Sequence, residues 1–374
     1  MLSLASVATA LLQSYDEFTI PALAPIAYNT CIILGALLLA PVIGIQGVAI
    51  GVVIGSFFFL ASQLPAARRR GLRLPREAPP ANRDVRRTFR LLLPRVAGQS
   101  AVQLSTIVTF TLAAGLGDGR PAAYRYAFTL FVLPIGLFGT SIATVTFPAM
   151  SREAVEQDAE GFLYLVRRAI RGVLFFIIPA GLGLIALRYP IIEMIYERGE
   201  FDNRAAALVA EPLLYFAAGI WAYALVDVLP RAFYALQDSI TPLKIAAVAV
   251  VLDVALSLLL SRLMGLGGLA LAFSAATGLQ VILLARALRS HVGPIVNASM
   301  WDYFYRLAIA SSSMVFALYL AQPVLSEYQA LALPGLVLRV GLVVGGSAAV
   351  YIFISYLLGQ DEVGVLARLA RRIT

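Results

Sequence analysis

An aspartate in the middle of a long apolar run is the residue of this chain that most needs a chemical explanation. Asp253 lies about halfway along the run 242–261, and Ser257 follows one helical turn later on the same face. A carboxylate is costly in hydrocarbon, so it must point into a helix bundle or a wet cavity. The pair predicts either a site for a proton or Na⁺ that drives transport, or a buried, hydrogen-bonded acid.

Polar and cationic side chains in two earlier apolar runs are candidates for binding an anionic headgroup. They are Arg95, Gln103 and Ser105 in one run, and Arg125 and Thr129 in the next. Arginines that face a central cavity clamp a diphosphate through paired hydrogen bonds. Arginines near the end of a span also fit snorkelling to the interface. Both readings stay open for Arg95 and Arg125.

A further arginine stands beside an acidic residue on one predicted helix. Asp227 and Arg231 are four residues apart around Pro230, which is the spacing of an i,i+4 pair. The pair predicts a structural contact, and Arg231 is also a candidate for the cavity.

Composition defines the elements that must position these residues. With 60% hydrophobic and 13% charged residues and a mean hydropathy of +0.85, the chain lies far from soluble domains. Its apolar runs predict an all-α integral membrane protein of about eleven transmembrane helices. The runs lie near 2–14, 22–41, 45–64, 89–116, 122–147, 162–187, 206–226, 242–261, 267–288, 303–321 and 335–358.

The net charge of +8 is explained by where the basic residues stand, so it does not indicate nucleic acid. Nine arginines lie between Arg68 and Arg90, and other basic residues gather at 152–171, 286–306 and 368–372. Short basic loops face the cytoplasm, so the C-terminus is predicted to be cytoplasmic. Binding of anionic lipid headgroups is the alternative role for the basic linker.

The chain contains an internal repeat. Pro21, Gly44, Gly47 and Ala49 return 221 residues later as Pro242, Gly265, Gly268 and Ala270. Such repeats are typical of transporters whose halves rock around a central site. Residues 89–205 precede the second copy and have no counterpart before the first. This asymmetry predicts that about three helices of a longer parent stand before Met1.

The sequence offers little for other chemistry. Cys31 is the single cysteine, and His291 lacks a partner at metal-ligand spacing. Gly-rich phosphate loops, H-E-x-x-H and G-x-S-x-G motifs are absent from the sequence. We therefore expect no metal, no cofactor and no enzymatic activity.

Four stretches resemble a known family. Leu-Pro-Ile-Gly-Leu-Phe-Gly at 133–139, continued to Arg152, looks like the eighth helix of the MurJ/MviN lipid II flippases. These belong to the multidrug, oligosaccharidyl-lipid and polysaccharide exporter superfamily. Residues 231–242, 196–201 and 18–25 agree in order and spacing. The resemblance covers nearly the whole chain, beginning at what would be the family's fourth helix.

The resemblance implies two pseudo-symmetric helical lobes, of which the N-terminal one is incomplete. Residues 1–64 would be its remnant, 65–88 a basic cytoplasmic linker, and 89–288 the C-terminal lobe. Residues 289–374 would add two C-terminal helices and a basic tail. The implied task is to move undecaprenyl-diphosphate-linked peptidoglycan precursor, lipid II, across the bacterial cytoplasmic membrane by alternating access. Membrane potential, Na⁺ or H⁺ would drive the cycle.

Two departures from the family pattern bear on the site. In the eighth helix the family usually has an acidic or amide residue followed by Arg, where this chain has Phe128 and Thr129. In the fourth helix Asp16 and Glu17 stand where a basic residue is frequent. Two alternatives therefore remain: a flippase for another polyprenyl-linked oligosaccharide of the O-antigen or capsule type, and a degenerate membrane scaffold that transports nothing.

Overall fold

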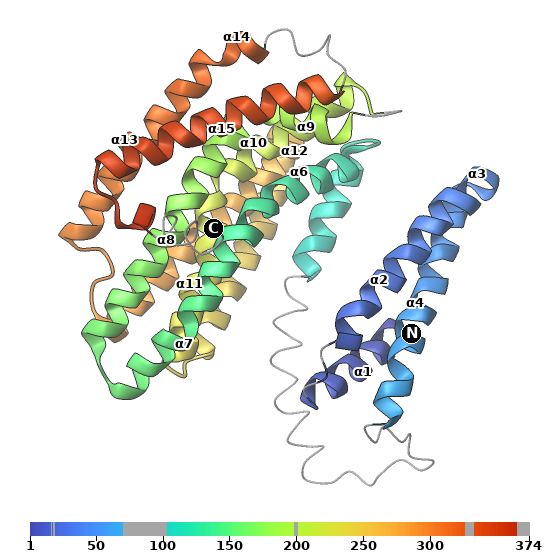
Figure 1. Cartoon of the computed structure of the whole chain (residues 1–374), viewed down its shortest axis with the longest axis horizontal. Helices are drawn as coiled ribbons and strands as arrows, with labels where there is room; N and C mark the ends of the chain where they lie inside the picture. The colour runs from blue at the N-terminus through green and yellow to red at the C-terminus, as the bar shows by residue number, and fades with distance from the viewer. Residues whose placement is uncertain (16, 18, 70–102, 198–200, 326–332, 365–374) are drawn as a thin grey trace. The chain divides into compact units, whose positions relative to one another are not determined.

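The computed structural model describes residues 1–15, 17, 19–69, 103–197, 201–325 and 333–364, and every regular element among them is a helix (Figure 1). Seven of these helices are long and apolar enough to cross a membrane, and one bent pair makes up to eight. The predicted class, an all-helical membrane protein, is confirmed. The predicted count of eleven is not confirmed by the described residues. The chain divides into two units, Met1–Arg90 and Leu91–Thr374.

The first unit consists of a short helix and a tightly packed hairpin. Its elements are α1 (Leu2–Ser14), α2 (Thr19–Leu34), the π-helix η1 (Gly35–Leu39), α3 (Ala40–Ile43) and α4 (Ile45–Arg69). Glycines let α2 and α4 touch through their backbones, because a Cβ on Gly51 would lie 2.7 Å from the carbonyl oxygen of Cys31. Close approach of this kind replaces the hydrophobic effect as the source of stability in lipid.

The described part of the second unit starts with the helix Gln103–Gly115 and continues through α13 and α15. Its further elements are α6 (Arg120–Pro134), the π-helix η2 (Ile135–Gly139), α7 (Thr140–Glu156), α8 (Ala159–Ala186), α9 (Arg188–Tyr196), α10 (Asn203–Ala218), α11 (Ile220–Ala235), α12 (Ile240–Val292), α13 (Ala298–Leu320), α14 (Gln322–Leu325) and α15 (Leu333–Leu357). Helix α8 packs against α7, α11 and α13, and α13 runs beside α15 (Figure 1). The core therefore lies around α8, α10 and α11.

The sequence repeat has a counterpart in backbone geometry. Gly44 separates α3 from α4 with φ +64° and ψ −149°, and Gly265 breaks α12 with φ +58° and ψ −132°. Both conformations belong to a region that only glycine adopts readily. Helices α2 and α12 also begin 221 residues apart, at Thr19 and Ile240. Each unit therefore contains the same glycine-broken hairpin of two spans.

The second glycine of each repeat allows the two arms of its hairpin to meet. A Cβ on Gly47 would lie 2.8 Å from the Cβ of Leu39, and a Cβ on Gly268 would overlap the carbonyl group of Leu260. Leu39 and Leu260 are themselves 221 residues apart. The packing, and not only the turn, is thus repeated.

Replacing Gly268 with alanine is expected to destabilise the protein by about 2 kcal/mol or more, because the new methyl group would overlap backbone atoms that cannot move aside. Gly278→Ala is the matched control on the same helix, since nothing lies within 4 Å of its Cβ position. Unfolding in mixed detergent micelles measures both variants. Equal stability of the two variants would contradict this account of the hairpin.

The start of α12 is fixed by an aspartate cap. The Oδ1 atom of Asp238 accepts hydrogen bonds from the backbone N–H groups of Ile240 and Thr241, each at 3.0 Å. Hydrogen bonds from Thr241 hold the pKa of Asp238 below its usual value, and nearby His291 adds to this effect. The Nε2 atom of His291 lies 3.9 Å from Oδ2 of Asp238. This contact joins the start of α12 to its end.

Candidate functional site

A polar cavity of about 350 Å³ lies within the second unit, between the helix Gln103–Gly115, α6, α11 and α12. Its polar lining side chains come from all four helices. They are Ser105, Thr106, Thr109, Tyr124, Arg125, Tyr223, Asp253, Thr277 and Gln280. The cavity thus contains an anionic and a cationic side chain within one apolar bundle.

Asp253 provides the negative charge of the cavity. It is 8% exposed, and its Oδ2 atom accepts a hydrogen bond of 2.5 Å from the Oγ of Ser105. Ser257 is buried one turn further along α12. The structure therefore brings Asp253 together with Ser105, which the sequence had suggested only as a headgroup residue. A carboxylate flanked by hydroxyl groups has the oxygen chemistry that a proton or a small hard cation needs.

Arg125 provides the positive charge. It lines the same cavity from α6, and Gln280 reaches the cavity from α12. Thr129 instead donates its hydroxyl hydrogen to the carbonyl oxygen of Arg125, 2.9 Å away on its own helix. Gln103 is exposed at the start of its helix and is not among the cavity's lining residues. Arg95 lies outside the described residues.

An aromatic cluster contributes Phe128, Tyr223 and Phe273 to the wall of the cavity, and Phe131 and Phe216 pack against them. The rings of Phe131 and Phe216 stack with their centroids 5.2 Å apart. The rings of Phe128 and Phe273 meet edge to face with their centroids 5.8 Å apart. Tyr223 joins the cluster 5.3 Å from Phe131. Such rings combine large apolar area with fixed geometry. Phe128, which departs from the family pattern, therefore has a packing role.

The predicted contact between Asp227 and Arg231 is wrong in detail. Asp227 accepts a 2.7 Å hydrogen bond from Thr140, and Arg231 donates a 2.8 Å bond to Thr144, so both residues reach across to α7. Threonines one turn apart on α7 face residues one turn apart on α11. Arg231 stands outside the lining of the polar cavity.

The sequence reasoning missed five of the polar lining residues: Thr106, Tyr124, Tyr223, Thr277 and Gln280. Thr277 and Gln280 are polar residues three apart within an apolar span, and Phe273 lies one turn before Thr277. That spacing places all three on one helix face. The same reasoning that selected Asp253 and Ser257 would have found Thr277 and Gln280.

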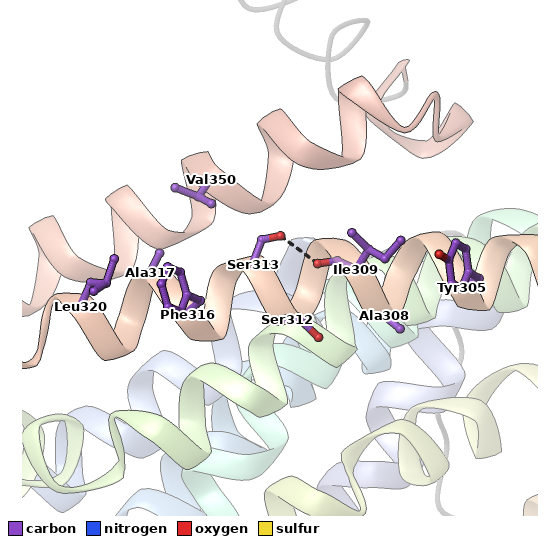
Figure 2. Close-up of a pocket in the computed structure, with 9 residues that line it drawn as sticks. All are labelled: Tyr305, Ala308, Ile309, Ser312, Ser313, Phe316, Ala317, Leu320 and Val350. Carbon is purple, nitrogen blue, oxygen red and sulfur yellow. Dashed lines mark hydrogen bonds between the residues drawn. The ribbon is translucent and has the colours of Figure 1, made fainter.

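Two other hollows of the second unit are almost wholly apolar. Figure 2 shows the larger, a groove of about 730 Å³ lined by α13 residues from Tyr305 to Leu320 and by Val350 of α15. The second, of about 560 Å³, lies between α6, η2, α8, α13 and α15. In the described part of the chain, no three His, Cys, Asp or Glu side chains gather as metal ligands.

A bundle of membrane-spanning helices that encloses a charged cavity is the architecture of a multi-pass membrane transporter. Residues 1–339 match the family described as "Lipid II flippase MurJ". The chain therefore belongs to the lipid II flippase MurJ family, whose members are transporters and not enzymes.

Relatives and a solved structure agree with this assignment. The chain is 30% identical over 353 residues to the probable lipid II flippase MurJ of Vibrio cholerae, covering 94% of this chain and 67% of that protein. It is 28% identical to the lipid II flippase MurJ of Burkholderia cenocepacia, covering 84% of this chain but only 62% of that protein. A lipid II flippase MurJ in an inward closed conformation superposes with a TM-score of 0.78 at 24% identity, covering 96% of this chain and 71% of that one. This likeness shows the fold.

Proposed function

We propose that the protein moves lipid II across the bacterial cytoplasmic membrane by alternating access. The observation that carries the proposal is the family match over residues 1–339. The polar cavity of the second unit supports it, because a transported headgroup needs hydrogen-bonding groups inside an apolar bundle, and Arg125, Asp253 and Gln280 line this cavity. Undecaprenyl-diphosphate-linked peptidoglycan precursor is then the substrate, and no cofactor is required.

Arg125 is our first candidate for contacting the diphosphate. Its planar guanidinium offers paired donors that match phosphate oxygens, and it lines the same cavity as Gln280 and Thr106. Arg231 is a weaker candidate, because it lies outside the lining of the polar cavity and donates a hydrogen bond to Thr144. Arg95, Gln103 and Thr129 remain in the proposal as weaker candidates. Ser105 belongs instead with Asp253, because its hydroxyl is bonded to that carboxylate.

Asp253 is our candidate for coupling transport to a cation. Neutralising the carboxylate with H⁺ or Na⁺ would remove a negative charge from a cavity that must accept an anionic headgroup. The oxygens of Ser105 and Ser257 would complete the surroundings of the ion. Membrane potential supplies about 2.3 kcal/mol per 100 mV for each charge moved, which makes such coupling effective.

The apolar cleft of about 560 Å³ is our candidate for holding part of the lipid tail. Leu130 and Leu133 line it from α6, whereas Arg125 and Phe128 of the same helix line the polar cavity. Headgroup and tail would thus contact two faces of one helix. This arrangement suits a substrate with one charged end and one hydrocarbon end.

We further propose the domain organisation and orientation that the sequence suggests. Residues 1–64 would belong to the N-terminal lobe, 65–88 to a cytoplasmic linker, 89–288 to the C-terminal lobe, and 289–374 to two added helices and a tail. With eleven helices and cytoplasmic basic loops, the C-terminus would face the cytoplasm. The end of the second unit that carries Arg152, Arg168 and Arg289, here called the basic end, would be the inner end.

Complementation tests the function. The gene, with any upstream coding sequence, is expressed in a bacterium depleted of its own lipid II flippase, and we expect growth to continue. A parallel strain lacking its O-antigen flippase distinguishes the alternative substrate. Well-expressed protein that restores O-antigen but not growth would replace lipid II with that substrate, and failure in both strains would favour the scaffold alternative.

A further inference from the structure

Two neighbouring spans of the second unit are interrupted at nearly the same level. One is divided by the π-helix η2 into α6 and α7, and the other bends by 48° at Gly219, between α10 and α11. Phe131 lies one turn before η2, and its ring contacts Phe216 and Tyr223 at 5.2 and 5.3 Å. Those two residues flank Gly219. The two interruptions are therefore about one turn apart in depth.

The helix segments before the two interruptions pack against each other, and so do the segments after them. Helix α6 packs on α10, and α7 packs on α11. The α6–α10 contact is aromatic, with Tyr124 and Phe131 each 5.2 Å from Phe216. Beyond the two interruptions, η2 meets α11: a Cβ built on Gly139, at the end of η2, would lie 3.7 Å from the Cβ of Ala224. Helix α6 thus pairs with α10 and α7 with α11, while α8 packs against α7, α10 and α11 and borders both pairs.

The α7–α11 contact is polar and doubled. Thr140 donates to Asp227 at 2.7 Å, and Arg231 donates to Thr144 at 2.8 Å. Both bonds involve a charged group, and such bonds are stronger than those between neutral groups. Two bonds one turn apart fix the relative rotation and the axial position of the helices. They link α7 to α11 toward the basic end.

The bend at Gly219 is built into the packing. A Cβ at Gly219 would overlap the side chain of Ser274, so no other residue fits there without movement. The Oγ of Ser274 donates a 2.9 Å hydrogen bond to the carbonyl oxygen of Tyr215, one turn before the bend. The N–H of Gly219 also donates to this carbonyl oxygen at 3.3 Å, so the helical bond persists through the bend. Ser274 adds a second hydrogen bond, which ties α12 to α10 beside the bend.

We propose that α7 and α11 move as one body relative to α6 and α10, on hinges at η2 and Gly219. π-Helices are rare and are frequent at functional sites, and packed elements move between discrete arrangements. Tyr223 stands on α11 and lines the polar cavity, whereas Arg125 and Phe128 line it from α6. The movement would change the separation of these walls. Thr140 and Thr144 are then positioning residues that link the two moving helices.

Spin-label distance measurements test the movement. Cys31 is first replaced by serine, and labels are placed in pairs at exposed positions: Val145 on α7, Tyr234 on α11 and Ala122 on α6. The full chain is measured in detergent, in lipid nanodiscs with NaCl or KCl, and with lipid II added. We expect the Val145–Tyr234 distance to stay constant while the two distances to Ala122 shift together. The proposal fails when the Val145–Tyr234 distance changes as much as the others, or when all three stay fixed in every condition.

A pair of variants tests the link itself. Thr140→Val with Thr144→Val removes both hydroxyl groups at nearly constant volume, and we expect a broader Val145–Tyr234 distance distribution. Thr146→Val is the matched control on α7, because that hydroxyl bonds only to carbonyls of its own helix, at 2.8 and 3.3 Å. Equal broadening in the control, or none in the double variant, would refute the link. The readout requires no transport, so failure of the proposed function would not affect it.

Discussion

Asp253→Asn is expected to lower the rate of lipid II translocation at least about tenfold while leaving the protein folded. Asparagine keeps the size of the side chain and can still accept a hydrogen bond from Ser105, so packing is preserved. The lost element is the negative charge. A bond between a charged and a polar group contributes about 1.5 to 3 kcal/mol, which corresponds to a roughly ten- to hundredfold change in cation binding.

Translocation into proteoliposomes, measured across a series of NaCl concentrations and pH values, separates the two roles of Asp253. A coupling site predicts that the wild-type protein responds to the cation or to pH and that the variant loses this response. A merely structural acid predicts a changed unfolding midpoint with the response intact. Asp118→Asn, in the exposed turn before α6, is the control for loss of a carboxylate elsewhere. Ser105→Ala should weaken the response without abolishing it.

Periodicity and composition predicted the helical membrane class and the burial of Asp253, because an isolated carboxylate within an apolar run has few places to go. The spacing of 221 identified Gly44 and Gly265 as equivalent positions of a repeat, and the structure adds that they share one backbone conformation. Both inferences come from composition and spacing, and neither requires knowing which helices become neighbours.

The partners of these residues were not predictable, because they come from distant segments. Ser105 and Asp253 are 148 residues apart in sequence, and no local pattern selects one for the other. Asp227 and Arg231 had the spacing of a mutual pair, but α7 presents threonines to both, and those bonds formed instead. The π-helix η2, which follows Pro134 and so changes the direction in which the side chains of α7 point, has no recognisable pattern in the sequence either.

Arg171→Met is expected to destabilise the protein by about 3 kcal/mol, because it would strand a buried carboxylate at the junction between α8 and the segment after α15. The Nε atom of Arg171 lies 3.0 Å from Oε1 of Glu362, whose side chain is 11% exposed. Removing one partner of a buried ion pair costs about 3 to 5 kcal/mol. The guanidinium also covers the ring of Tyr303, 4.9 Å from its centroid. The loss should therefore loosen α13 as well as α15.

A double-mutant cycle with Glu362→Gln identifies the cause of that loss. The Oε2 atom of Glu362 is buried without a hydrogen-bond partner among the described residues, so its charge depends on Arg171. Arg171→Met should therefore cost less, by at least about 1 kcal/mol, when Glu362 is already neutral. Unfolding in mixed micelles measures the stability of each variant in the cycle. Arg168→Met is the control, because Arg168 is an exposed arginine three residues earlier on α8. Additive losses would mean that Arg171 acts through Tyr303 and packing, and that the C-terminal helices are held to α8 without this ion pair.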